Sequence, residues 1–384
     1  MIPFVGKKSA RVAAVADVGS GSAGIAIVSF GGTAPSKVLV EQRGYLPQEK
    51  REPAQTASAL ATLLRESAET ALKHYADKHK EPVSDVYAIV HAPWVRSKTI
   101  RGSSTFPEPT LIDEAIIGRL AKETLAQEQE FDKSAIMEAS VVRVELQGYP
   151  TSKPEGKRAS DIAVSVLVSE CDKNVRASVK ETLGAVFPGL QVAFRSPTRA
   201  FLSILRENHD LPKDCLVVDV TSEGTDITAV RQGVTVDHTV VPEGSRSILR
   251  KIASDRMPEE TLSLMKMLAH DQCENESCEA IKAAIAKVEP DLAKIFGEGM
   301  GKIATRARLP NRLLFTAEDD IASWLQQFFS RIDFTQFTVT TRPFAAEQIA
   351  GAAITRFVDI GEQLQSDAGF ATSLALVNIE GRDE

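Results

Sequence analysis

Apolar runs that end in an acid and a small-residue turn occur twice, once in each half of the chain. The first lies in residues 12–28, where an apolar strand leads to Asp17 and the turn Gly19-Ser20-Gly21-Ser22. The second lies in residues 215–230, where an apolar strand leads to Asp219 and the turn Thr221-Ser222-Glu223-Gly224. In such a hairpin the turn N–H groups can face a phosphate and the acid can hold a metal ion. The alternative for each copy is an ordinary polar hairpin turn.

Strand and helix periodicities alternate along the rest of the chain, which predicts a mixed α/β fold. Residue alternation predicts strands at 12–17, 24–30, 37–44, 86–91, 141–146, 161–168, 190–194, 234–241, 312–316, 337–341 and 372–379, the last of which is expected to close a sheet. Helical spacing predicts helices at 53–80, 113–129, 174–187, 196–206, most of 257–305, 321–329 and 345–364.

Composition excludes several functional classes. The 384 residues are 25% charged and 43% hydrophobic with a net charge of −7, which is ordinary for a globular protein and gives no electrostatic footprint for nucleic acid. No apolar run approaches the roughly 18 residues of a membrane span, and the N-terminus reads as a first strand rather than a signal peptide. Cys273 and Cys278 have no second ligand pair nearby, so metal binding there is disfavoured.

Two acid-headed hairpins, each opening a half of the chain, predict two similar lobes that clamp one ligand. Together with segments 141–169, 238–253 and 369–379, their order resembles the actin-like ATPase superfamily, most closely the branch that contains FtsA and PilM. The resemblance implies an α/β, actin-like (ribonuclease H-like) two-lobed fold with an inserted small α+β subdomain of the SHS2 type. The implied division is 1–84 with 185–212 as the first lobe, 85–184 as the inserted subdomain and 213–384 as the second lobe, with a helical part at 245–308.

The resemblance also implies a ligand, ATP with Mg²⁺, held between the lobes. One carboxylate from each loop suits magnesium, which keeps several of its waters. Carried over by residue, the metal ligands are Asp17 and Asp219, and no catalytic residue is assigned. The remaining nucleotide-binding positions are small residues of the two loops: Gly19, Ser20, Gly21, Thr221, Ser222, Gly224 and Thr225.

Three segments depart from the family pattern. Thr221, Ser222 and Glu223 stand where the family has glycines, and a carboxylate about 5 Å from a phosphate costs on the order of 3 kcal/mol at an effective dielectric of 20. The alternative is that Glu223 points away or binds the metal. Segment 195–200 lacks the acid or amide that positions attacking water, and segment 314–320 has Ala317 and Glu318 in place of glycines. We therefore expect ATP turnover to be weakened or lost.

The last residues distinguish the two relatives. FtsA-like proteins carry a basic amphipathic helix that docks on the membrane, whereas segment 377–384 is short and acidic, so no direct membrane insertion is expected. The expected role is PilM-like: a cytoplasmic scaffold, recruited to the inner face of the membrane by the tail of a membrane-anchored pilus protein. The alternatives are an FtsA-like division adaptor and an active, polymerising ATPase, so self-association stays open. Expected walls of the tail groove are 86–91, 112–125 and Trp94, although a packed core tryptophan explains Trp94 equally well.

Overall fold

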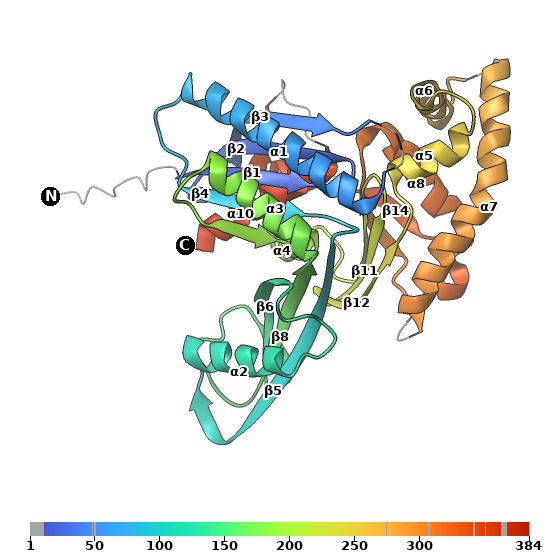
Figure 1. Cartoon of the computed structure of the whole chain (residues 1–384). Coiled ribbons are helices and arrows are strands. Elements are labelled where there is room, and N and C mark those ends of the chain that lie inside the picture. The colour runs from blue at the N-terminus through green and yellow to red at the C-terminus, as the bar shows by residue number, and fades with distance from the viewer. Residues whose placement is uncertain are drawn as a thin grey trace.

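Three β-sheets and the helices around them make up the part of the chain that the structure describes (Figure 1). The computed structural model describes residues 11–47, 49, 51–273, 275–305, 308–340, 342–349, 351–361 and 367–383. Within this part of the chain, none of the helices is long and apolar enough to cross a membrane.

The first lobe is built on a six-stranded sheet that is covered on both faces. Because alternate residues of β1 face opposite sides and both sides are buried, the strand reads as one continuous apolar run. The long helix α1 (Pro53–Ala76) and α3 (Lys173–Val186) pack on one face, and α4 (Pro197–Glu207) and α10 (Ala368–Asp383) on the other. The sheet order is β15 (Val358–Asp359), β3 (Ser36–Tyr45), β2 (Ser22–Phe30), β1 (Arg11–Val18), β4 (Asp85–Val90) and β9 (Val192–Arg195).

The second lobe repeats the hairpin on a five-stranded sheet. Its helices, which form the yellow-to-orange group at the right of Figure 1, bury a core rich in phenylalanine, with Phe296, Phe315, Phe328 and Phe329 fully enclosed. The sheet order is β12 (Val234–Val241), β11 (Thr225–Arg231), β10 (Cys215–Val220), β13 (Arg312–Thr316) and β14 (Ala345–Gln348). The helices are α5 (Ser245–Ala253), α6 (Pro258–Ala269), α7 (Glu276–Ala304) and α8 (Asp319–Arg331).

A small α+β unit projects from the first lobe between β4 and α3, at the bottom of Figure 1. Helix α2 (Glu114–Ala126), capped by the Asp113 side chain, packs on one face of a four-stranded antiparallel sheet. The sheet order is β5 (Val95–Leu111), β8 (Arg158–Cys171), β6 (Ile136–Leu146) and β7 (Tyr149–Thr151). The unit is thus narrower than the expected range 85–184, because β4 lies inside the first sheet between β1 and β9, and α3 packs against α1.

The predictions for the last 50 or so residues of the chain are wrong in three places. Residues 372–379, expected as a strand, belong to helix α10; its residues are buried on nearly every side, and a helix buried all round has the same unbroken apolar pattern as a buried strand. In the described part of the helix expected at 345–364, the structure has β14, the short α9 (Ala352–Thr355) and β15, with Gly351 and Gly361 at positive φ; residues 350 and 362–364 lie outside the described residues. The strand expected at 337–341 begins within the 3₁₀ turn Thr335–Phe337, and only Thr338 forms a bridge, to Leu309; Thr341 lies outside the described residues.

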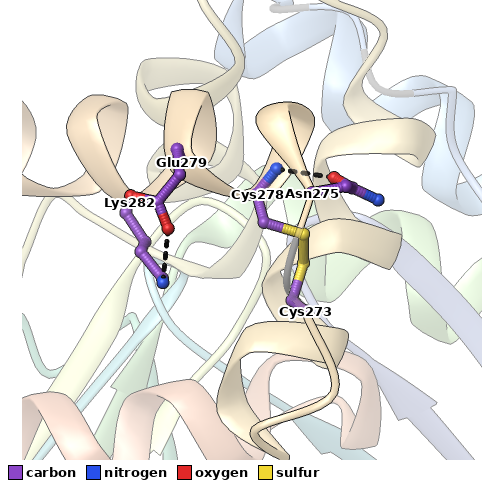
Figure 2. Close-up of a disulfide and its surroundings, with 5 residues drawn as sticks. All are labelled: Cys273, Asn275, Cys278, Glu279 and Lys282. Carbon is purple, nitrogen blue, oxygen red and sulfur yellow. Dashed lines mark hydrogen bonds and ion pairs between the residues drawn. A yellow bond between two sulfur atoms is a disulfide. The ribbon is translucent and has the colours of Figure 1, made fainter.

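Cys273 and Cys278 form a disulfide at the corner between α6 and α7 (Figure 2). Beside it, the Asn275 side chain accepts a hydrogen bond from the Cys278 N–H and begins α7. The two cysteines are therefore covalently paired rather than metal ligands.

Replacing Cys278 by serine is expected to lower the unfolding free energy by about 2 kcal/mol, which is the chain entropy of closing so short a loop. Denaturant unfolding of Cys278→Ser against the oxidised wild type measures the loss, and the wild type under reducing agent should match the variant. Equal stability of oxidised and reduced wild type would contradict it.

Candidate functional site between the lobes

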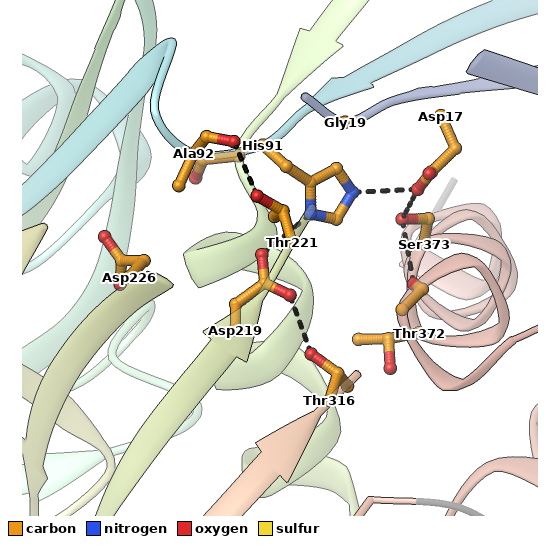
Figure 3. Close-up of polar contacts among 12 residues, drawn as sticks. Asp17, Gly19, His91, Ala92, Asp219, Thr221, Asp226, Thr316, Thr372 and Ser373 are labelled. Atoms are coloured by element: carbon orange, nitrogen blue, oxygen red, sulfur yellow. Dashed lines mark hydrogen bonds and ion pairs between the residues drawn. The ribbon is translucent and has the colours of Figure 1, made fainter. Parts of the chain in front are cut away.

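The two predicted acids lie at facing strand ends. Asp17 is near the end of β1 and pairs with Gly24 of β2, and Asp219 has the equivalent place on β10, paired with Asp226 of β11. Both carboxylates are buried, with 1% and 4% of their surface exposed. The repeated hairpin thus brings one acid from each lobe to a common centre, as Figure 3 shows.

A histidine stands between these two acids. His91 follows β4 directly, and its backbone N–H donates to the Val18 carbonyl oxygen at 2.9 Å. Its ring atom Nε2 lies 2.8 Å from Asp17 Oδ2, and Nδ1 lies 2.8 Å from Asp219 Oδ2 (Figure 3). Ionised carboxylates only accept hydrogen bonds, so both ring nitrogens must donate and the ring is an imidazolium.

The charges of this triad support one another. Burial alone would lower the pKa of His91, but Asp17 and Asp219 outweigh it and hold that pKa well above its usual value. Burial alone would raise the pKa of Asp17, but His91, with help from Arg43, lowers it to about 2. The centre is therefore a buried cation shared by two carboxylates, one from each lobe.

The other carboxylate oxygens also have donors. Asp17 Oδ2 accepts from the Ser373 hydroxyl at 2.8 Å, and Asp17 Oδ1 from Arg43 Nη2 at 3.2 Å. Asp219 Oδ1 accepts from the Thr316 hydroxyl at 2.7 Å. All four oxygens of the two acids are hydrogen-bonded within the protein.

The two loops touch each other directly. The Ser20 and Thr221 hydroxyl oxygens are 2.8 Å apart, and the Glu223 N–H donates to Ser20 Oγ at 2.8 Å. A Cβ on Gly21 would lie 2.2 Å from Ser222 Oγ, so glycine is required for this approach. The Gly19 and Thr221 N–H groups are engaged within their own loops, with Ser22 and Gly224 carbonyls.

Three further acids lie near the two loops: Glu223, Glu318 and Asp367. Glu223 forms a two-pronged ion pair with Arg250 of α5 and does not line the central cavity, so it points away, which was the less favoured expectation. Glu318 and Asp367 do line it, and burial raises the pKa of Glu318. Arg43 lies between Asp17 and Asp367, 3.1 Å from the latter.

The space left between the loops is a cavity of about 40 Å³ lined by these residues. At roughly 10–15 Å³ per water it holds about three waters, whereas ligand pockets are typically about 300–1,000 Å³. Among the described residues, no group of three or more His, Cys, Asp or Glu is arranged to hold a metal ion. In this arrangement the residues do not fit the magnesium nucleotide that the fold implies.

The structure therefore brings the predicted site residues together, but their polar groups form hydrogen bonds within the protein. Thr225 donates its hydroxyl to the Glu243 carbonyl oxygen behind the loop rather than toward the cavity. Sequence reasoning missed His91, Arg43, Thr316 and Ser373. Of these only Arg43 had a signal in the sequence: it faces Gly24 near the start of β2, and a glycine within a strand often marks a close approach of another group.

Gly244 is expected to be intolerant of a side chain. A Cβ there would lie 2.3 Å from the Thr221 carbonyl oxygen and 2.6 Å from the Gly224 nitrogen, both backbone atoms that cannot rotate away. Gly244→Ala should cost about 2 kcal/mol of unfolding free energy, measured by denaturant unfolding. Gly184→Ala, in an open position on α3, is the control and should be neutral or slightly stabilising. Equal effects would contradict the loop packing.

A second, larger hollow lies on the outer face of the first lobe. It measures about 770 Å³ and runs between α1 and α3 with Trp94 at one side. Of the three expected groove walls only Trp94 lines it: residues 86–90 are buried in the sheet, His91 is in the central site, and α2 packs on its own sheet. Seven of the residues that line it have small side chains: Ala54, Ala57, Ser58, Ala61, Thr62, Ser178 and Thr182.

Comparisons with known proteins find similarity in structure alone. No protein-family model matches the chain, and no curated protein matches it. The solved structure described as the PilM-PilN type IV pilus biogenesis complex superposes with a TM-score of 0.59 at 15% identity, over 97% of this chain and 99% of that chain. The ethanolamine utilization protein EutJ from Carboxydothermus hydrogenoformans gives 0.45 at 10% identity, over 97% and 90%. The chain therefore has the two-lobed actin-like fold, in the form seen in the PilM-PilN structure.

Proposed function

We propose that this actin-like protein is a scaffold of a type IV pilus or related envelope assembly, which binds the tail of a membrane-anchored partner. The observation that carries the proposal is the full-length likeness to the PilM-PilN structure, inserted subdomain included. The partner would bring the chain to the cytoplasmic face of the membrane.

The groove between α1 and α3 is the proposed tail site. Its charged lining is three carboxylates, Glu66, Asp172 and Glu181, against one guanidinium, Arg65. Cytoplasmic segments next to a membrane span are enriched in lysine and arginine, so an acidic groove suits such a tail. The seven small side chains that line the groove leave room for the tail backbone. Trp94 offers a half-buried aromatic surface to anchor the tail.

A charge-bearing obstruction in the groove tests the proposal. Ala57→Arg places a long, positively charged side chain in the groove, where it blocks space and repels a basic tail. We expect the variant to bind a synthetic PilN-type cytoplasmic tail at least about tenfold more weakly, measured by fluorescence anisotropy. Ala76→Arg is the matched control, because Ala76 is exposed at the end of the same helix and does not line the groove. Equal weakening by both variants, or by neither, would contradict this site.

Binding of division proteins by the wild type, with no binding of pilus tails, would favour the FtsA-like adaptor instead. The other alternative, a polymerising ATPase, requires a nucleotide between the lobes, where the cavity is only about 40 Å³. A cytoplasmic protein must also bind its partner when the Cys273–Cys278 disulfide is reduced, because disulfides are rare in reducing compartments. Since Cys273–Cys278 lies in the second lobe and the groove in the first, tail binding should be the same with and without dithiothreitol.

A further inference from the structure

The place where an actin-like protein would hold its metal and phosphates is filled here by a side chain of the protein itself. We propose that the His91 ring, hydrogen-bonded to one carboxylate of each lobe, stands where the cation of a bound nucleotide would lie and holds the lobes closed, so the closed form requires neither nucleotide nor metal. This goes beyond the scaffold proposal and does not depend on it, because it concerns the central site and not the groove.

The position of His91 is determined by both lobes. Parallel pairing of β4 with β1 sets Val90 opposite Val18, so the next residue enters the space just beyond Asp17. From the second lobe, Asp219 reaches the other ring nitrogen while Thr316 on the neighbouring strand holds its free oxygen. His91 is 5% exposed and has a carboxylate at each ring nitrogen, so the ring links the two lobes.

A metal ion would find no free ligand at this centre. Magnesium binds carboxylate oxygens at about 2.0–2.1 Å. Each oxygen of Asp17 and Asp219 already accepts at least one hydrogen bond, and the His91 ring occupies the space between the two acids. Binding therefore requires His91 to leave.

The two loops that would face a phosphate are also bonded to each other. Ser20 joins the two loops through the Thr221 hydroxyl and the Glu223 N–H. Thr221 also donates its hydroxyl to the Ala92 carbonyl oxygen, the residue after His91, at 3.0 Å. Arg246 of α5 crosses from the second lobe to the Leu46 carbonyl oxygen. These contacts hold the two lobes together around the central site.

Calorimetric titration of the wild type with Mg·ATP is the first test, since it needs no variant. We expect no binding at millimolar concentration and no shift of the thermal unfolding midpoint. Micromolar binding, or a midpoint raised by Mg·ATP, would overturn the proposal.

Chemical rescue of His91→Gly is the second test. The variant leaves a ring-sized hole between two carboxylates, so millimolar imidazole, or Mn²⁺ as a cation probe, should raise its unfolding midpoint by at least about 2 °C and leave the wild type unchanged. His238→Gly is the matched control: His238 is partly buried on β12, where burial lowers its pKa, and neither probe should rescue it. A His91→Gly protein that neither probe stabilises, or a wild type that both stabilise equally, would overturn the proposal.

Discussion

Replacing His91 by alanine lowers the unfolding free energy by about 3–5 kcal/mol, the usual effect of removing one partner from a buried ion pair. The physical cause is the pair of acids left behind, because Asp17 and Asp219 then face each other while buried, without the cation that kept the pKa of Asp17 at about 2. Denaturant unfolding at neutral pH measures the loss. The expected effect exceeds that of a truncation to alanine at a partly buried surface site.

A double-mutant comparison separates charge from packing. In an Asp219→Asn background one of the stranded charges is already absent, so adding His91→Ala should cost clearly less than it costs in the wild type. Thr316 can still donate to the amide oxygen of the new side chain, which keeps the backbone around β10 and β13 in place. Equal costs in the two backgrounds would mean that His91 contributes packing alone.

The repeated hairpins could be predicted because local sequence determines them. Each has an alternating apolar pattern, an acid at a strand end and small turn residues, and both appear in the structure with the acids at matching positions. The long helices of the second lobe were confirmed for the same reason, since α6 and α7 show clear helical spacing with a polar break between them.

The occupant of the central site could not be predicted, because long-range pairing places it there. Val90-His91-Ala92 carries no local motif; only the β1–β4 register brings the ring to Asp17, and only closure of the lobes brings Asp219 to its other side. Ser373 could not be predicted because the structure of its segment was predicted wrongly. The sequence of α10 has no visible helical period, so its residues were expected to form a strand, in which Ser373 would not face Asp17. Errors in local structure thus became errors about the site.

Replacing Asp226 by asparagine stabilises the protein at pH 8 by about 2–4 kcal/mol and has little effect at pH 4. Asp226 lies beside the central acids, and burial, reinforced by the charge of Asp219, raises its pKa to about 7 against a hydrogen bond from Thr228 that lowers it. An unfolded aspartate has a pKa of about 3.9, so the full shift of about 3 units corresponds to roughly 4 kcal/mol. The lower figure allows for the part of the residue that reaches solvent.

The sign follows from proton counting. Between about pH 4 and pH 7 the folded state holds a proton on Asp226 that the unfolded state has lost, so rising pH destabilises the fold across that window and no further above it. The asparagine cannot ionise, and its amide oxygen can still accept from Thr228, so the variant escapes this loss. Denaturant unfolding at pH 4, 6 and 8 should show the difference between variant and wild type growing with pH, while titrations of groups remote from Asp226 cancel. Asp77→Asn, at an exposed carboxyl after α1, corrects for the loss of one negative charge. A difference that is the same at all three values would mean that Asp226 ionises in the folded protein as it does in the unfolded chain.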